Sequence, residues 1–263
     1  MRFAVNYSVP LINLLNEGLV KIDLIKCPDW EGMLTEARPF GDITIHYDLK
    51  IGLGKTFNID LNRIETLQKK THTPHINTHL VTPRNFDPDN SHEMQKINHL
   101  WREEIQIMID RFGASNIVLE HFPYTLTTPH IRPAADSKIF SNVILDAGCM
   151  LLLDIAHARI TADTLGMDVR QYISAFPLDR LVELHMTGIK KFNGVLTDHF
   201  ELSQEDYELL SWALNEINRG NWRRPEIIAL EYGGVGTTFT WRTDPLLLRE
   251  QVPKLYQMIH TQK

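Results

Sequence analysis

Short apolar runs alternate with helix-like segments along this chain. Continuous apolar runs without polar alternation are typical of strands buried on both faces of a parallel sheet. We predict eight such strands, at residues 3–8, 20–27, 43–49, 75–80, 116–122, 150–157, 180–187 and 227–232. Eight strands alternating with helices indicate an α/β fold of the closed (β/α)8 barrel class, the TIM barrel, which typically takes about 250 residues.

The segments between the apolar runs carry helix boundaries. Residues 92–113 place apolar side chains at helical spacing, and residues 203–220 begin with a Ser-x-x-Asp capping box. No repeat, low-complexity tract or linker divides the sequence, so we predict a single (β/α)8 barrel domain over residues 1–263. The longest irregular segments, 81–91 and 188–202, follow predicted strands and therefore belong to the face where barrel enzymes place their chemistry.

The charge balance and the cysteine count narrow the functional classes. The chain has 27 Lys and Arg against 33 Asp and Glu, a net charge of −6, and no basic run. Nucleic-acid binders normally carry a basic face, so a nucleic-acid partner is disfavoured. Cys27 and Cys149 are too few for a disulfide framework, which predicts a reduced, cytoplasmic protein. No apolar run approaches the roughly 18 residues of a membrane span, so we expect no membrane partner.

Potential metal ligands recur at the C-terminal ends of the predicted strands. Six of the eight predicted strands end in such a group, and an Asp-His pair follows in the loop after the seventh. The residues are His46, His79, Glu120, Asp154, His157, His185, Asp198, His199 and Glu231. In a barrel all strand ends converge on one small volume, so we expect these side chains to lie close together.

Each of these residues alone is more often a hydrogen-bonded structural group than a ligand. Together, however, Glu120, Asp154 and Glu231 would crowd three carboxylates at one rim, and Asp198 would add a fourth. Like charges at such range disfavour ionisation unless cations lie between them. The pattern therefore predicts divalent metal ions, and a set of imidazoles and carboxylates without thiolates suits iron, manganese or zinc. The bland alternative for Asp154-x-x-His157 is a helix cap followed by a surface histidine.

The order of these residues resembles the metal-binding pattern of the xylose isomerase-like barrels. That pattern is a Glu, then Asp-x-x-His, then a strand-end His and a final Glu. It is matched by Glu120, Asp154, His157, His185 and Glu231. With His46 and His79 upstream, the set is similar to the trinuclear site of endonuclease IV.

Within these barrels, the motifs are most similar to those of the multinuclear non-heme iron-dependent oxidative enzymes, the family of MbnB and TglH. The motifs are INTHL, IVLEHFPY, GCMLLLDIAHARITA, VELHMTGI and DHF, and the resemblance covers most of the chain. It implies a xylose isomerase-like barrel with two or three divalent metal ions, iron preferred over zinc or manganese. It also implies oxidation of a thiol- or cysteine-containing small molecule or peptide, with a partner protein as an option.

Carried over position by position, the resemblance implies three metal sites. The first uses His46, His79 and Glu120; the second uses Glu120, Asp154, His185 and Glu231; the third uses His157, Asp198 and His199. The family places one residue between the last Asp and His, whereas Asp198 and His199 are adjacent. Neighbours in an extended segment point in opposite directions. Either a tight turn brings both inward, or only one of them binds.

Three alternatives remain open. A sugar isomerase or epimerase would use the carboxylates and His185 around a single divalent metal, and would leave His46 and His79 without a task. A phosphodiester hydrolase similar to endonuclease IV would use several zinc ions, but the acidic balance counts against DNA as its substrate. A non-catalytic barrel that binds metal or a partner would have filled coordination spheres.

Overall fold

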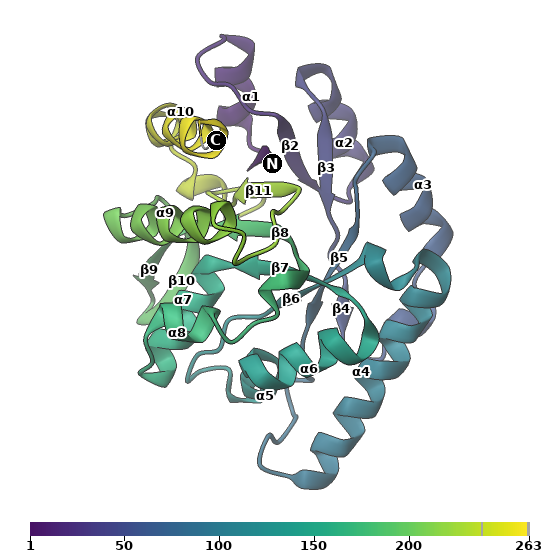
Figure 1. Cartoon of the computed structure of the whole chain (residues 1–263). Helices are drawn as coiled ribbons and strands as arrows, with labels where there is room; N and C mark the ends of the chain where they lie inside the picture. The colour runs from purple at the N-terminus through teal and green to yellow at the C-terminus, as the bar shows by residue number, and fades with distance from the viewer. Residues whose placement is uncertain (238, 262–263) are drawn as a thin grey trace.

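A curled parallel sheet, surrounded by helices, forms the centre of the computed structural model (Figure 1). The structure describes residues 1–237 and 239–261. The strands are β1 (Arg2–Asn6), β2 (Leu24–Pro28), β3 (Ile43–His46), β4 (Lys50–Ile51), β5 (Ile76–Leu80), β6 (Ile117–His121), β7 (Met150–Asp154), β8 (Leu181–Met186), β9 (Gly188–Phe192), β10 (Val195–Phe200) and β11 (Ile227–Leu230). The helices are α1 (Val9–Asn16), α2 (Glu31–Ala37), α3 (Leu61–Thr71), α4 (Ser91–Phe112), α5 (Arg132–Ala135), α6 (Ser137–Ala147), α7 (Ile155–Leu165), α8 (Val169–Ile173), α9 (Gln204–Asn218) and α10 (Pro245–His260). Short 3₁₀ helices cover Arg38–Phe40, Thr56–Asn58, Ala114–Asn116, Pro129–Ile131, Leu178–Arg180 and Thr240–Arg242.

The strand order makes the sheet curl into a barrel. Neighbours follow the order β3, β2, β1, β11, β8, β7, β6, β5, β4, and every pairing is parallel. The two ends of this order, β3 and β4, are consecutive in the chain, with only residues 47–49 between them. The predicted α/β-barrel class is therefore confirmed. Within the described residues its sheet has nine strands where eight were predicted.

The predicted third strand, residues 43–49, is in fact two strands. β3 pairs with β2 and β4 pairs with β5, so the chain changes partner between them. The Tyr47 N–H donates to the side-chain oxygen of Asn77, and the His79 N–H donates to the Leu49 carbonyl, each at 3.0 Å. These bonds hold the interruption against β5, so the third strand position still contributes to the barrel wall.

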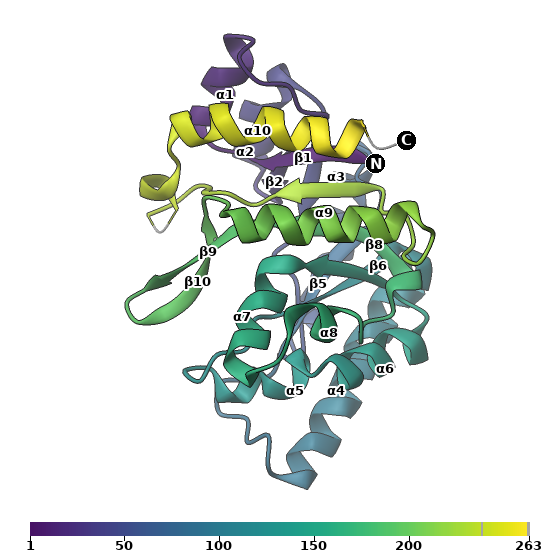
Figure 2. The same cartoon turned by 60° about the vertical axis from the view of Figure 1, so that its left-hand side comes forward.

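Two other predicted strand boundaries and one predicted irregular segment were wrong. The second strand begins at Leu24 rather than at residue 20, and the sixth ends at Asp154, so His157 lies on α7. The segment 188–202 is mostly a hairpin of β9 and β10 that projects from the barrel (Figure 2). Its turn residues Asn193 and Gly194 have φ angles of 51° and 82°. Left-handed backbone at both positions is the conformation of a type I′ hairpin turn.

Helices α4 and α9 begin and end close to the predicted residues. Asn90 is the N-cap of α4 and Gly113 is its C-cap. Ser203 and Asp206 make both hydrogen bonds of the predicted capping box at the start of α9. No helix among the described residues combines the length and the apolar character needed to cross a membrane.

Two small apolar clusters lie apart from the large core that the sheet shares with the helices. They are Val118, Met150, Leu152 and Val182, and Ala4, Leu24, Ile227 and Ala229. Because side chains alternate along a strand, Glu120 and Asp154, two residues after Val118 and Leu152, share the face of these clusters. On β6 and β7 the inner face of the barrel is therefore apolar below and polar at the C-terminal strand ends.

Candidate metal centre

Strand pairing places the predicted ligands at one level of the barrel. In the parallel register, His79 lies opposite Glu120 and Asp154 lies opposite His185. A cavity of about 590 Å³ opens at this end. Seven of the nine predicted ligands line it: His46, His79, Glu120, His157, Asp198, His199 and Glu231. The other two, Asp154 and His185, are fully buried beside it.

The donor atoms of these residues form three groups, within each of which they lie no more than 4.8 Å apart. The groups are His46–His79–Glu120, His46–His185–Glu231 and Glu120–Asp154–His157. Glu120 and His46 each belong to two groups. The structure thus brings eight of the predicted ligands within reach of one another, counting Asp198 through its contact with His157 at 3.2 Å.

Glu120 lies at the centre of this cluster. Its Oε2 is 3.1 Å from His79 Nε2 and 3.7 Å from His46 Nε2. Its Oε1 is 3.4 Å from His157 Nδ1 and 3.7 Å from His185 Nδ1. One carboxylate therefore faces four imidazoles, two on each oxygen, which is the geometry expected of a bridging ligand.

The His185 ring is oriented by hydrogen bonds on the side away from the cluster. Its Nε2 lies 2.8 Å from Glu183 Oε1, and Glu183 Oε2 in turn lies 2.5 Å from His75 Nε2. This fixes Nδ1 toward the cluster, where it lies 3.3 Å from Glu231 Oε1. Carboxylates bonded to the second nitrogen of a ligating histidine commonly orient the ring and raise its basicity.

We expect Glu183→Gln to weaken metal binding at the group that contains His185 by about 10- to 100-fold, because glutamine removes the charge that orients the ring. Metal titration of the apo-protein, with elemental analysis of the product, measures this change. His99→Ala is the control, since His99 lies exposed on α4 and contacts Glu103. Unchanged affinity in Glu183→Gln would show that the hydrogen bond only supports the fold.

Asp154 both caps a helix and faces the cluster. Its Oδ1 accepts from the His157 N–H at 2.8 Å, which makes it the N-cap of α7. This capping places His157 in the first turn of the helix, where the residue is 5% exposed and does not lie on the surface. His157 Nδ1 lies 2.9 Å from the His121 carbonyl, and its Nε2 lies 3.2 Å from Asp198 Oδ2. The helix cap was therefore the right interpretation, but the histidine is not a surface residue.

A bulge in β10 brings both Asp198 and His199 to the cavity. The register between β9 and β10 shifts between Thr197 and Phe200, and His199 has a left-handed φ of 62°. This conformation costs a residue with a side chain roughly 1 kcal/mol, so it requires support from its surroundings. The support includes a contact of 3.2 Å between His199 Nδ1 and the Gly233 carbonyl. Of the two alternatives left by the sequence, the structure has the tight turn with both side chains at the cavity.

Arg242 stabilises the backbone of this bulge. Its Nη1 donates to the Asp198 carbonyl at 3.1 Å, and its guanidinium lies within 5.5 Å of four aromatic ring centres. The rings are Phe192 and Phe200 of the hairpin and Phe239 and Trp241 of the loop after β11. Cation–π contacts of this kind join the hairpin to that loop.

The directions of the pKa shifts show that the buried carboxylates stabilise positive charge on the histidines beside them. Burial opposes protonation of His157 and His185, but Asp154 and Glu231 outweigh it: the pKa of His157 lies well above its usual value, and that of His185 is raised to about 10. Burial also raises the pKa of Asp154, and Glu231 and Glu120 raise it further. The cluster therefore favours additional cationic charge, which protons supply in the metal-free protein.

A second, independent observation supports a metal centre at these residues. Three buried donor atoms that face the cluster make no hydrogen bond within the described residues: Glu120 Oε2, Asp154 Oδ2 and His185 Nδ1. Leaving a buried polar atom unpaired costs about 1–3 kcal/mol, so such a concentration calls for a ligand. Coordination of a divalent cation would satisfy the carboxylate oxygens and, after proton loss, the imidazole nitrogens.

Three functional candidates escaped the sequence prediction: Lys26, His75 and Glu183. Lys26 lies 3% exposed in β2 and forms an ion pair with Glu231. The sequence signal that could have identified Lys26 is a single charged residue within an otherwise apolar strand, two residues before the strand ends.

His121 is a buried histidine that lies outside the ligand cluster. It lies on the outer face of β6 among Phe140, Tyr172 and Phe176, and burial lowers its pKa to about 3.

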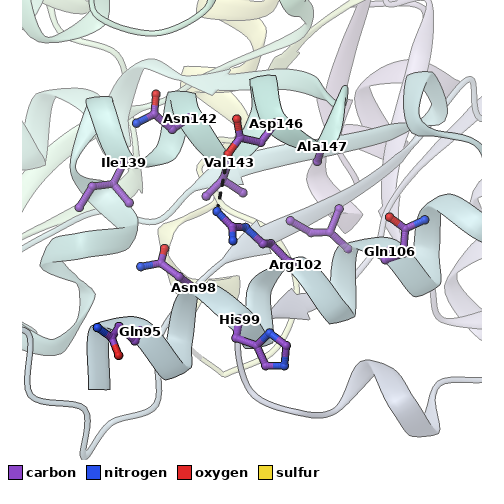
Figure 3. Close-up of a pocket in the computed structure, with 11 residues that line it drawn as sticks. Gln95, Asn98, His99, Arg102, Gln106, Ile139, Asn142, Val143, Asp146 and Ala147 are labelled. Atoms are coloured by element: carbon purple, nitrogen blue, oxygen red, sulfur yellow. Dashed lines mark ion pairs between the residues drawn. The ribbon is translucent and has the colours of Figure 1, made fainter. Parts of the chain in front are cut away.

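A second hollow, of about 630 Å³, lies between α4 and α6, away from the strand ends (Figure 3). Carboxamides such as Gln95, Asn98 and Asn142 line it, and Arg102 faces Asp146 across it at 3.8 Å. Both charged residues are largely exposed. None of the predicted metal ligands borders this hollow.

Solved structures similar to this chain define its structural class. D-psicose 3-epimerase, solved in the presence of D-fructose, matches 100% of this chain and 99% of its own with a TM-score of 0.60 at 12% identity. A xylose isomerase domain protein from Alicyclobacillus acidocaldarius matches 98% of this chain and 99% of its own with a TM-score of 0.56 at 15% identity. An AP endonuclease, family 2, from Brucella melitensis matches 91% and 95% with a TM-score of 0.58 at 12% identity. At these identities the likeness shows the fold, a xylose isomerase-like barrel.

The family follows from the sequence match. A family described as RiPP precursor modification enzyme MbnB/TglH/ChrH matches residues 42–221, more than half of the chain. The chain belongs to this family. A UPF0276 protein of Acaryochloris marina is 24% identical over 222 residues, 80% of this chain and 74% of that protein. A UPF0276 protein of Caulobacter vibrioides is 24% identical over 181 residues, 66% of this chain but only 62% of that protein.

Proposed function

We propose that this chain is a di- or trinuclear iron enzyme that oxidises a cysteine-containing peptide or small thiol with O₂ as the oxidant. One observation carries the proposal: Glu120 belongs to two of the three ligand groups and faces imidazoles with both oxygens. A single-metal site has no need of such a bridge. A one-metal sugar isomerase or epimerase would leave His46, His79 and His157 unexplained.

The nine predicted residues would hold the ions in the arrangement that the family resemblance implies. His46, His79 and Glu120 would hold the first ion, and Glu120, Asp154, His185 and Glu231 the second; His157, Asp198 and His199 would complete a third site. Ferrous ions in such a site supply open coordination positions at which O₂ and a thiolate can meet. A set of imidazoles and carboxylates suits iron, zinc and manganese alike, and we prefer iron because of the family resemblance, with zinc and manganese as alternatives.

The rest of the cavity is suited to a peptide. Its lining includes the aromatic side chains Trp30, Phe122 and Phe239, which would cover apolar substrate groups and exclude water. Gly233 and Gly234 line it as well, with φ angles of 61° and 141°. A Cβ on Gly233 would lie 2.1 Å from Thr243 Oγ1, so this turn requires glycine and exposes backbone to a bound chain. The net charge of −6 argues against nucleic acid as the substrate.

The test is elemental analysis of anaerobically purified protein, followed by absorption spectroscopy after O₂ exposure and mass spectrometry of cysteine-containing peptides incubated with it. We expect more than one iron per chain, an oxygen-sensitive absorption band and a mass change that needs the cysteine. One manganese or cobalt per chain with sugar isomerisation, or three zinc ions with phosphodiester hydrolysis, would replace the proposal. Protein that binds no metal under any of these conditions would refute it.

A further inference from the structure

The proposed third metal site depends on the β9–β10 hairpin, whereas the other two sites use residues of the barrel strands or directly after them. Asp198 and His199 both belong to β10. Asp198 Oδ2 lies 3.2 Å from His157 Nε2, and Asp198 Oδ1 lies 4.0 Å from His199 Nε2. Among the described residues, neither Asp198 nor His199 belongs to one of the three donor groups. Whether they can share an ion with His157 therefore depends on what positions the hairpin.

The two imidazole rings of this site are already oriented toward Asp198. His157 Nδ1 lies 2.9 Å from the His121 carbonyl, and His199 Nδ1 lies 3.2 Å from the Gly233 carbonyl. A hydrogen bond at one ring nitrogen determines which nitrogen remains for a metal ion, and here Nε2 remains on both rings. The position of the Asp198–His199 backbone is then the quantity that decides whether the three donors meet.

Arg242 is the side chain that contacts this backbone. It is 7% exposed, and its Nη1 donates to the Asp198 carbonyl at 3.1 Å. Its buried Nε has no hydrogen-bond partner within the described residues, and Arg242 does not line the strand-end cavity. Buried charged side chains are normally paired with an opposite charge. Here the recorded partners are the carbonyl of a predicted ligand residue and four aromatic rings of the hairpin and of the loop after β11.

We propose that Arg242 is a positioning residue for the third metal ion, because it holds the bulge of β10 in the conformation that brings Asp198 and His199 to His157. This inference rests on the proposed function. His199 has a left-handed φ of 62°, a conformation that persists only where the surroundings enforce it. Without Arg242 the bulge can relax toward a regular strand, in which neighbouring side chains point in opposite directions and only one of the two reaches the cavity. The two ions held by the barrel strands do not depend on this contact.

The sign of the effect distinguishes positioning from the other roles that Arg242 could have. A guanidinium that acted on the site only through its charge would repel the metal ion, so its removal would strengthen binding. A guanidinium that only stabilised the fold would leave the metal affinity of the folded protein unchanged. Positioning predicts a third result, in which removal of Arg242 weakens the binding of the third ion alone.

The experiment is an anaerobic titration of metal-free protein with Co²⁺, with competition by a chelator for affinity and elemental analysis for stoichiometry. We expect the wild-type protein to bind three ions per chain. Arg242→Met removes the charge and the donor but keeps an unbranched apolar stem, and should weaken the third ion by about 10- to 100-fold, the range seen when the partner of a ligand is removed. The other two ions should keep their affinity, which also reports that the variant is folded.

Three further variants complete the test. Arg242→Lys retains the charge but lacks the planar fork that reaches both the carbonyl and the rings, so we expect a smaller weakening in the same direction. Asp198→Asn should abolish the third ion directly, which identifies the site that Arg242→Met weakens. Arg249→Met is the matched control, since Arg249 lies exposed on α10, and it should bind all three ions as the wild type does.

A third ion that Arg242→Met and Arg242→Lys bind as tightly as the wild type, or more tightly, would overturn the role of Arg242 and leave the metal centre standing. Equal weakening of all three ions would also overturn it, because Arg242 would then support the whole centre rather than one site. Wild-type protein with two ions that Asp198→Asn retains would overturn this inference and leave a dinuclear centre. Wild-type protein that binds no Co²⁺, Fe²⁺ or Zn²⁺ would overturn the proposed function itself.

Discussion

Replacing Glu120 by glutamine is expected to remove more than one metal ion per chain and to lower iron-dependent peptide oxidation at least about a thousandfold. Glutamine keeps the length and shape of the side chain but has no negative charge, and its amide nitrogen cannot bind a cation. Because both oxygens of Glu120 face imidazoles of different groups, one substitution affects two groups at once. Elemental analysis and oxygen uptake in the presence of a cysteine-containing peptide measure the two effects.

Glu104→Gln is the matched control for this variant. Glu104 is also fully buried, but it lies on α4 and accepts hydrogen bonds from the Gly52 and Thr56 N–H groups. Its replacement should cost stability, about 1–3 kcal/mol, without changing the metal content. If Glu120→Gln retains its full metal content and activity while Glu104→Gln behaves as described, Glu120 is a structural carboxylate and the bridging role is wrong.

The strand ends could be predicted from the sequence because the geometry of a parallel barrel leaves little freedom there. Once Glu120 and Asp154 are placed at the ends of continuous apolar runs, their neighbours in the register follow, and His79 and His185 lie opposite them. The prediction required only the period of side-chain alternation and the convergence of parallel strands. It did not require any knowledge of individual contacts.

The interrupted third strand could not be predicted from residues 43–49, because the change of partner depends on β5. Tyr47 gives its N–H to a side chain, that of Asn77, and nothing in the local sequence indicates this. The β9–β10 hairpin is different: Asn193 and Gly194, with Phe192 before them and Val195 after them, are a recognised hairpin signal, so this hairpin could have been predicted from the local sequence. The bulge at His199 likewise depends on tertiary contacts, those with Gly233 and Arg242.

The predicted ligand set omitted charged residues that act on the ligands. Lys26 and Glu183 each lie in the interior of an apolar run, where the overall hydrophobicity of the run conceals a single charge. Their partners, Glu231 and His75, are distant in sequence by 205 and 108 residues respectively. Contacts of this separation are set by the closure of the barrel, so only the structure could identify them.

Substitutions of Asp154 are expected to have the second large effect, and they distinguish its contribution to metal binding from its contribution to helix capping. Its Oδ1 caps α7 through the His157 N–H, whereas its Oδ2 has no hydrogen-bond partner and faces the cluster. Asp154→Asn keeps an oxygen that can cap the helix but removes the charge. We expect it to lose metal at the Glu120–Asp154–His157 group and to lower oxidation about a hundredfold or more. The metal-free variant should unfold at no lower denaturant concentration than the wild type, because burial raises the pKa of Asp154 and its charge is costly to keep.

Asp154→Ala should lose the same metal and, in addition, about 1 kcal/mol of unfolding free energy relative to Asp154→Asn, the usual contribution of an N-cap. Asp136→Ala provides the matched control, since Asp136 caps α6 by accepting from the Lys138 and Ile139 N–H groups and lies outside the ligand groups. It should lose a similar capping energy and retain all of its metal. Full metal content in Asp154→Asn would mean that the unpaired oxygen is not a ligand, because the helix cap alone would then account for the presence of the aspartate.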